Sequence, residues 1–195
     1  DAIDYEIQQF TKAEIAQAFA MTYSANGQIF ALFTFKSNRI PSKTFVFNGT
    51  ASALGGGLVW FELQSGVSDS AWRVNTIIKA YGKILLGDDV DGRIGVLDDA
   101  TFTDYGNPLF RQATTSPFNQ DGLPIFAGEF EATFESGTGL NTGQGSDPQV
   151  RMDFSDDGAR TWSNEFSRSI GKIGAYEQRS IWRRQGRFPV ARVIR

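Results

Sequence analysis

Residues 150–187 contain the feature that most constrains the fold of this chain: two runs of alternating apolar and polar residues, separated by a compact turn and a glycine-containing link. Val150, Met152 and Phe154 alternate with polar residues, and a second alternating run, rich in arginine, covers 176–187. A period of two places successive side chains on opposite faces of a strand. The stretch therefore predicts half-buried β-strands joined by tight turns.

The turn itself, SDDGARTW at 155–162, resembles the Asp-box, a hairpin turn with the pattern S-x-D-x-G-x-T-W. Asp157 can accept hydrogen bonds from backbone N–H groups inside the turn, Gly158 can adopt a positive φ, and Trp162 can pack back over the turn. The predicted structural turn consists of Ser155, Asp157, Gly158, Thr161 and Trp162, while Ala159 occupies the place of the motif's second glycine. Because function resides in sites rather than in turns, we interpret this turn as a structural element that stabilises the fold.

The composition excludes several kinds of site. The 195 residues include 21 Gly and 17 Phe but no Cys and no His, which favours β structure with many turns. Without cysteine there is no disulfide, thiolate metal site or cysteine nucleophile, and without histidine the commonest general base is missing. No apolar run approaches the length of a membrane span. We therefore expect no catalytic residues, no metal site, no cofactor and no membrane contact.

The first half of the chain has the pattern of short antiparallel strands. A capping box of Thr11 and Glu14 predicts one short helix over about 12–19, the only substantial helix expected. Asn26-Gly27 favours a type I′ hairpin turn between strands at 21–25 and 28–35. Further strands at 44–48 and 58–63 complete a four-stranded unit, and a similar pattern follows at 72–79, 83–87 and 93–97. Each unit has about the size of a β-propeller blade.

The acidic segment 88–92 lacks the downstream ligands and flanking helices of a calcium loop, so we interpret it as a hairpin turn. After an irregular segment with a domain boundary near 111–121, the remaining strands are expected to form a small antiparallel sandwich or barrel. The expected fold is all-β: partial, propeller-like antiparallel blades in domain 1–115, with one short N-terminal helix, and a C-terminal β-sandwich in domain 116–195 that contains the Asp-box-like turn. Two blades cannot close a propeller, so they must pack on each other or on a neighbouring chain.

Charge is unevenly distributed along the chain. The net charge is -3, but residues 151–195 carry ten Lys or Arg against five Asp or Glu, which leaves -8 on the other residues. A basic arm of this kind faces a negative surface of protein or nucleic acid, or protects a solvated strand edge. Strand alternation places three arginines on one face and the fourth on the other; the resulting interface candidates are Arg179, Arg183, Arg187 and Arg184.

The string SDDGARTWSNEFSRSIGKIGAYEQRSIWRRQGR at 155–187, followed by an Arg-containing strand, resembles the C-terminal region of the packaged-DNA stabilisation proteins of short-tailed bacteriophages, also called tail accessory factors. The resemblance is strongest over 150–195, and the order of elements upstream is also similar: a Phe-Thr-x-x-Glu helix start, a hairpin, and a Trp-containing strand. The SIGKIGxY and WRRxGR strings are its most specific parts.

This resemblance implies a propeller-like body with an appended β-sandwich. It implies a homo-oligomeric ring in the phage tail, below the portal and adaptor, that closes the channel and stabilises packaged DNA. The expected partners are the tail adaptor and the needle and tailspike-type proteins, and the expected location is the virion, after synthesis in the cytoplasm of the bacterial host. Because a net charge of -3 gives little long-range attraction toward a polyanion, we expect direct DNA contact to be weak or absent.

Two other classes of function stay open. A sialidase-like glycosidase would need an arginine cluster, a Tyr–Glu pair and an acidic residue on one face. Tyr176 and Glu177 are the nearest match, but adjacent strand residues point to opposite faces. A carbohydrate-binding or receptor-binding β module would use Trp and Tyr as stacking residues, and a glycan-binding screen would distinguish it from a tail-ring protein.

Overall fold

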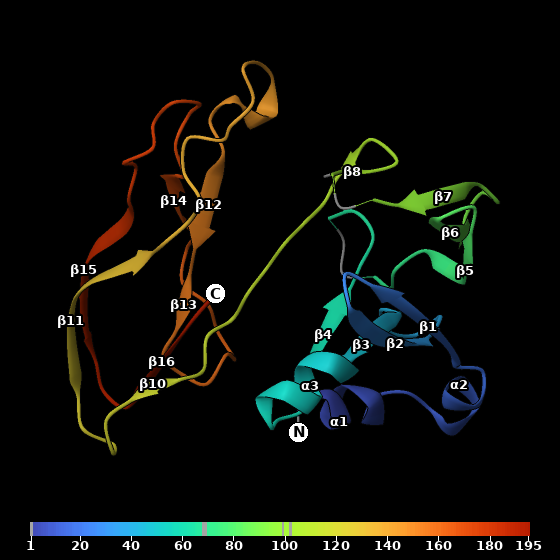
Figure 1. The fold of residues 1–195 in the computed structure, drawn as a ribbon. Coiled ribbons are helices and arrows are strands. Elements are labelled where there is room, and N and C mark those ends of the chain that lie inside the picture. Colours follow the sequence, from blue (N-terminus) through green and yellow to red (C-terminus); the bar gives the residue numbers. More distant parts are fainter. Residues whose placement is uncertain (1, 68–69, 99, 102) are drawn as a thin grey trace. The chain divides into compact units, whose positions relative to one another are not determined.

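The computed structural model describes residues 2–67, 70–98, 100–101 and 103–195 (Figure 1). The chain divides into two compact units, Asp1–Arg111 and Gln112–Arg195, here called the N-terminal and C-terminal units. Each is built almost entirely from short antiparallel strands, which confirms the predicted all-β class. No helix among the described residues has the length and apolar character needed to cross a membrane.

The N-terminal unit opens with two helices and a four-stranded antiparallel sheet in the order β1-β2-β3-β4. Its elements are α1 (Ala2–Gln8), α2 (Lys12–Ala16), β1 (Phe19–Ala25), β2 (Gln28–Phe35), β3 (Lys43–Asn48), α3 (Gly49–Gly55) and β4 (Trp60–Leu63). Each strand pairs with the next along the chain, as in a propeller blade. One face of this sheet packs its buried Phe35 and Phe45 against Phe10, in the segment between the first two helices.

A second sheet follows in the same unit and has the order β5-β6-β7. Its strands are β5 (Val74–Ala80), β6 (Lys83–Asp88) and β7 (Ile94–Leu97), followed by the short pair β8 (Thr103–Asp104) and β9 (Asn107–Pro108). β1 and β5 are in contact, so the two blade-like sheets pack on each other within the unit. A backbone N–H of Trp72 donates to Thr44 Oγ1 at 3.2 Å and adds a polar link between them.

The expectation of a single short helix over 12–19 is wrong in two respects. The capping box forms as predicted, with Thr11 N-capping α2, but the helix ends at Ala16 because the backbone becomes extended at Phe19 to begin β1. The unit also contains α1 and α3. The second of these begins at an Asn48 cap and ends at Gly56, whose φ of 68° suits a left-handed helix terminus. The glycines at 55 and 56 therefore terminate a helix.

The C-terminal unit contains seven strands in three small sheets, ordered β10-β16-β13, β11-β15 and β12-β14. The elements are β10 (Phe118–Asn119), β11 (Ile125–Ala132), the 3-10 helix η1 (Gln144–Ser146), β12 (Gln149–Met152), β13 (Phe154–Ser155), β14 (Phe166–Ser169), β15 (Ser180–Phe188) and β16 (Ala191–Ile194). Its core contains Met152, Trp182 and Ile194, one residue from each of three sheets. The Trp182 indole N–H donates to the Phe166 carbonyl at 2.8 Å and ties β15 to β14.

Candidate functional site

The turn at 155–162 is held together by its own side chains. Asp157 Oδ1 accepts from the backbone N–H groups of Arg160 at 3.0 Å and Thr161 at 2.9 Å, and its Oδ2 accepts from Thr161 Oγ1 at 2.6 Å. Ser155 donates its hydroxyl to Asp157 and accepts the Ala159 N–H. These hydrogen bonds hold the pKa of Asp157 well below its usual range, and the bond from the Thr161 hydroxyl contributes most. Asp157 is thus an ionised acceptor engaged inside the turn.

Two successive residues of this turn have left-handed backbones, Gly158 with φ 77° and Ala159 with φ 68°. Glycine adopts this conformation freely, whereas the Cβ of alanine makes it costly. The departure from the Asp-box pattern therefore places an alanine where the backbone favours glycine. The surrounding hydrogen bonds hold the turn in this conformation despite that cost.

Two arginines that follow β15, Arg192 and Arg195, contact the turn. Arg192 on β16 forms a bidentate pair with Asp156, and its guanidinium lies 3.9 Å from the Phe154 ring centroid and 4.6 Å from that of Phe188. Arg195 pairs with Asp153 and lies 4.0 Å from the ring centroid of the half-buried Trp162. The turn is therefore joined to the end of the unit by the Arg192–Asp156 pair and by the contact of Arg195 with Trp162, which supports a structural role for it.

The structural roles of Arg192, Asp153 and Asp156 were not predicted from the sequence. Arg192 is only 4% exposed, and its Nη1 also donates to the Gln185 carbonyl at 2.6 Å. One signal was available: Arg192 lies in the apolar run VARVI, and a cation inside an apolar strand is rarely buried without a partner. The identity of that partner could not be read from the sequence, because the carboxylate lies 36 residues away.

Arginines of the predicted arm lie along β15 opposite residues of β11. Arg179 forms a bidentate pair with Glu131, with 2.7 Å between Nε and Oε1, and Arg183 lies 3.6 Å from a carboxylate oxygen of its cross-strand partner Glu129. Arg187 is the cross-strand partner of Phe126, with its guanidinium 6.0 Å from the ring centroid. Two of the three arginines therefore have carboxylate partners within the same unit.

The fourth arginine, Arg184, does not follow the predicted alternation. Simple alternation would place it on the inward face with Trp182, yet its side chain is exposed and its φ is 60°. The register between β11 and β15 shifts at this point, where Arg183 pairs with Glu129 but Gly186 pairs with Ala127. Such a bulge inserts an additional residue into one strand and changes the direction of its side chains. The bulge explains why Arg184 is exposed.

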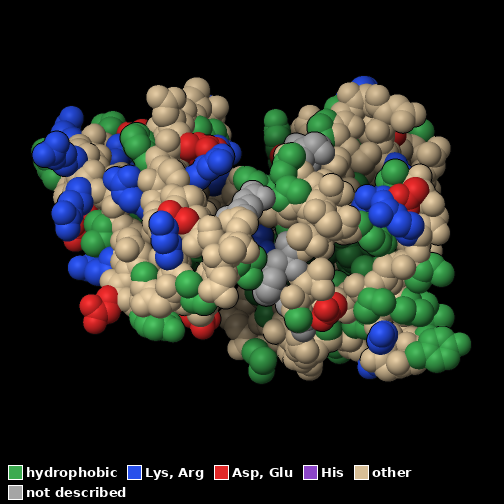
Figure 2. All heavy atoms as spheres, turned by 90° about the horizontal axis from the view of Figure 1, so that it is seen from above, with side chains coloured by type: hydrophobic (Ala, Val, Ile, Leu, Met, Phe, Trp, Pro, Cys, Tyr) green, Lys and Arg blue, Asp and Glu red, His purple; other side chains and the backbone are tan. Residues whose placement is uncertain are grey.

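Charges of both signs balance in the C-terminal unit as a whole. Its ten Lys or Arg residues are matched by ten Asp or Glu residues, five of them before residue 151. Figure 2 shows Lys and Arg side chains distributed over the visible face of this unit, at the left of the view, with acidic side chains among them. The unit is therefore neutral overall, and its positive character is local to particular strands.

The acidic turn at 88–92 is engaged by arginines. Arg73 Nε donates to the buried carboxylate of Asp88 at 2.9 Å, and Arg93 pairs with Asp91. The Tyr105 ring lies against both guanidiniums. Its centroid is 5.1 Å from the guanidinium carbon of Arg73 and 4.3 Å from that of Arg93. Within the described ranges, no group of three or more acidic side chains is arranged to hold a metal ion. The structure supports the interpretation of this segment as a hairpin turn.

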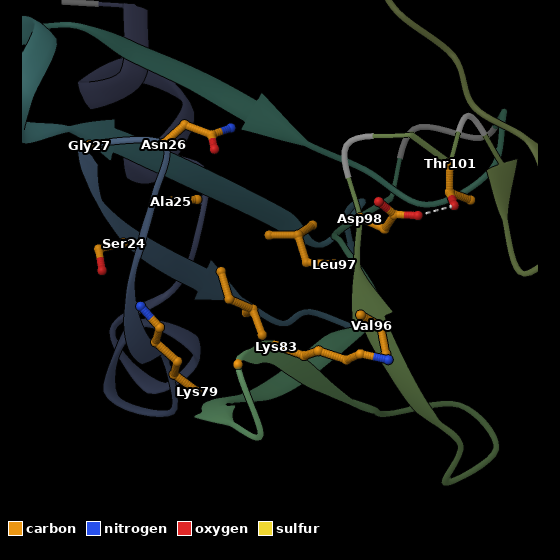
Figure 3. A pocket seen from close by; sticks show the side chains of 12 residues that line it. Ser24, Ala25, Asn26, Gly27, Lys79, Lys83, Val96, Leu97, Asp98 and Thr101 are labelled. Carbon is orange, nitrogen blue, oxygen red and sulfur yellow. Dashed lines mark hydrogen bonds between the residues drawn. The ribbon is translucent and has the colours of Figure 1, made fainter.

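One pocket, of about 790 Å³, lies in the N-terminal unit beside the turn between β1 and β2. Its polar lining includes Lys79, Lys83, Asp98 and Thr101. Figure 3 shows the two lysines extending to opposite sides of the pocket, and Asp98 accepts a hydrogen bond from Thr101 Oγ1 at 2.8 Å. In a binding site for one small ligand the polar groups converge on a common point. The polar groups of this pocket do not.

Tyr176 and Glu177, the nearest match to a glycosidase pair, are both exposed in the loop before β15. The Tyr176 ring lies close to Gly137, and its backbone carbonyl accepts from Ser136 Oγ at 2.7 Å. Among the described residues, no ion pair or hydrogen bond joins either side chain to the arginines of β15. The structure therefore does not bring together the groups that a sialidase-like site requires.

Blade-like antiparallel sheets followed by a second β unit, with a turn held by arginine, define this chain as a two-part all-β protein. Two family models cover nearly all of it: the β-propeller of bacteriophage P22 Gp10 matches residues 1–102, and the β-sandwich of the same protein matches residues 111–195. The chain belongs to the bacteriophage P22 Gp10 family of phage structural proteins, as the sequence resemblance predicted. Comparison with curated proteins finds no match.

Proposed function

We propose that this protein is a structural component of a phage tail that assembles as a ring below the portal and adaptor, closes the channel after packaging and keeps the genome inside the virion. The observation that carries the proposal is the match to both Gp10 domain models, in order, in one chain. Fold alone does not define function, but two consecutive domain matches within one family are more specific than a shared architecture.

The proposed role is mechanical and includes no catalysis. The two carboxylates of the Asp-box-like turn are engaged, Asp157 with Thr161 and Asp156 with Arg192, and Tyr176 lies in an exposed loop. This arrangement contributes to the stability of the sandwich and not to the reactivity of one side chain. Purified protein should therefore neither hydrolyse a fluorogenic sialoside nor bind glycans on an array. Either activity would favour the glycosidase or the receptor-binding alternative.

In this proposal the protein contacts a second copy of itself and neighbouring tail proteins of the adaptor, needle and tailspike type. Direct contact with DNA is weak or absent, because the chain has a net charge of -3 and its C-terminal unit is neutral. The protein is synthesised in the cytoplasm of the bacterial host and acts in the virion.

The test is to assemble particles of the encoding phage with and without this protein. Particles that lack it should package DNA and then lose it, measured as nuclease-resistant genome copies per particle, and adding purified protein before the DNA is lost should restore retention. Mass photometry of the protein, alone and mixed with tail components, should show a discrete ring-sized species. Full retention of DNA without the protein would overturn the proposal.

A further inference from the structure

The outward face of the β11–β15 pair has two chemically different ends. At one end Arg179 and Arg183 lie against Glu131 and Glu129, so each guanidinium has a carboxylate close by. The bond from Arg179 lowers the pKa of Glu131, as expected for an ionised partner. With side-chain exposures of 62% and 74%, these arginines contribute little to stability, but their charge is already compensated.

At the other end the arginines have no such partner. Arg187 lies over the ring of Phe126, and within the described residues neither Arg187 nor Arg184 forms an ion pair. Phe126 is 76% exposed although it is paired with β15, one residue from the end of β11. Beyond the last cross-strand pair, Ile125 with Phe188, the chain continues on each side into further exposed apolar residues, Leu123 and Val190.

The backbone at this end is also unusual. Arg184 has φ 60°, a conformation that is strained for a non-glycine residue. The bulge that requires it keeps the Arg184 side chain exposed and separates it from the carboxylates of β11. Backbone strain of this kind is concentrated at functional positions. Together with the unpaired charges and the exposed ring, it indicates a functional role for this end of the β11–β15 pair.

An exposed aromatic ring beside the Arg187 guanidinium, with exposed Arg184 three residues earlier on the same strand, has the composition of a protein–protein contact, in which aromatic residues and arginine are enriched. A protein partner can offer carboxylates to the guanidiniums and an apolar surface that buries the ring. The hydrated phosphate backbone of a nucleic acid does not bury an aromatic ring. In this chain the surplus of carboxylates lies in residues 1–111, with twelve Asp or Glu against nine Lys or Arg and a net charge of -3. The C-terminal unit, by contrast, is neutral and has no surplus to offer.

We propose that Phe126, Arg184 and Arg187 form a docking surface for the acidic N-terminal unit of a second copy of this chain. The inference rests on the proposed function insofar as that function requires assembly, and it identifies which face makes the contact. Arg179 and Arg183, which the sequence groups with Arg187, are excluded from the surface because carboxylates of the same unit already compensate them.

A charge-reversal experiment tests this assignment. In the full 195-residue chain, Arg184→Glu with Arg187→Glu should raise the dissociation constant for self-association at least about tenfold, measured by sedimentation velocity. The control, Arg151→Glu with Lys172→Glu, changes the net charge equally on other exposed segments and should leave association unchanged. Thermal unfolding of both variants should match that of the wild type, and equal association of the two variants would overturn the proposal.

The absence of native cysteine allows a second, positional test. Arg187→Cys, labelled with benzophenone maleimide and mixed with isotope-labelled wild-type chain, should cross-link to peptides from residues 1–111 of the labelled copy. Cross-links to residues 112–195 of the other copy would overturn the assigned occupant. If the full chain is monomeric at every concentration tested, the inference fails as well.

Failure of the inference can be distinguished from failure of the proposed function. If the double charge reversal associates normally and virions still retain their DNA, the ring is built through another surface and only the docking surface is wrong. If virions retain their DNA without the protein, the proposed function is wrong. Cross-linking of Arg187→Cys to an adaptor or needle protein in assembled tails, with none to a second copy, would also overturn the choice of a second copy.

Discussion

Arg192 and Asp156 form a bidentate arginine–carboxylate pair in the C-terminal unit, with 2.6 Å from Nε to Oδ1 and 2.7 Å from Nη2 to Oδ2. The side chain of Arg192 is 5% exposed, whereas that of Asp156 is 33% exposed. The two partners are therefore not equivalent. Loss of the carboxylate would leave a buried guanidinium without its counter-charge, while loss of the guanidinium would leave a carboxylate that water can reach.

Asp156→Ala should therefore destabilise the C-terminal unit by about 3 kcal/mol, the cost typical of breaking a buried pair. Chemical denaturation monitored by tryptophan fluorescence measures the change. The matched control is Arg151→Ala, which removes one partner of the exposed pair with Glu165 and should cost at most about 0.5 kcal/mol. Equal effects of the two substitutions would show that burial of Arg192 adds nothing.

Trp182 supplies a second test of the same core. It is almost completely buried, packs its ring 5.8 Å from that of Phe130 and donates its indole N–H to Phe166. Trp182→Ala should cost about 3–5 kcal/mol, and Trp182→Phe about 1–2 kcal/mol, because phenylalanine fills much of the volume but donates no hydrogen bond. Urea titration of the two variants gives both values, and a larger loss in the phenylalanine variant would contradict the order.

Local chemistry made the turns predictable. Asn26 and Gly27 have φ values of 51° and 74°, as a type I′ turn requires, and the Thr11–Glu14 capping box forms as the sequence indicated. The turn residues from Ser155 to Thr161 form the predicted local hydrogen bonds. Each of these features depends on residues within a few positions of one another, so a short stretch of sequence contains most of the information.

Long-range pairing was not predictable in the same way. The bulge at Arg184 exists because β15 must match β11, which lies about fifty residues earlier, and strand alternation alone does not anticipate the irregular backbone there. The carboxylate partners of Arg179, Arg183 and Arg192 are likewise distant in sequence. The helix α3 was missed because its Gly-rich segment has weak helix propensity, and the Asn48 cap had been assigned to a strand.

Ala159 offers a test in which stability should increase. Its φ of 68° is strained for alanine, so Ala159→Gly should stabilise the unit by roughly 0.5–1 kcal/mol, net of the greater entropy of glycine in the unfolded chain. Thermal unfolding of the two proteins measures this difference. The control is Ala132→Gly within β11, where the backbone is extended and glycine should destabilise by about 0.5–1 kcal/mol. Destabilisation by both substitutions would mean that Ala159 is not strained.

Glu14 gives the N-terminal unit an acid-sensitive cap. Hydrogen bonds from the Ser37 hydroxyl and the Thr11 backbone N–H lower the pKa of Glu14 from 4.5 to about 2. A carboxyl whose pKa is lower in the folded state stabilises the fold above its unfolded pKa, and this contribution is lost as the pH falls through the folded pKa. The stabilisation by Glu14 should therefore be complete above pH 4.5 and disappear by about pH 2.

Glu14→Gln isolates this effect, because glutamine can still accept the Thr11 N–H in the capping box but does not titrate in this range. Denaturation of wild type and variant at pH 7, 4, 3 and 2 should show wild type more stable at pH 7, with the difference shrinking between pH 4.5 and 2. Other carboxyl groups titrate equally in both proteins and cancel. A difference that stays constant down to pH 2 would show that the ionised form of Glu14 is not the one that caps α2.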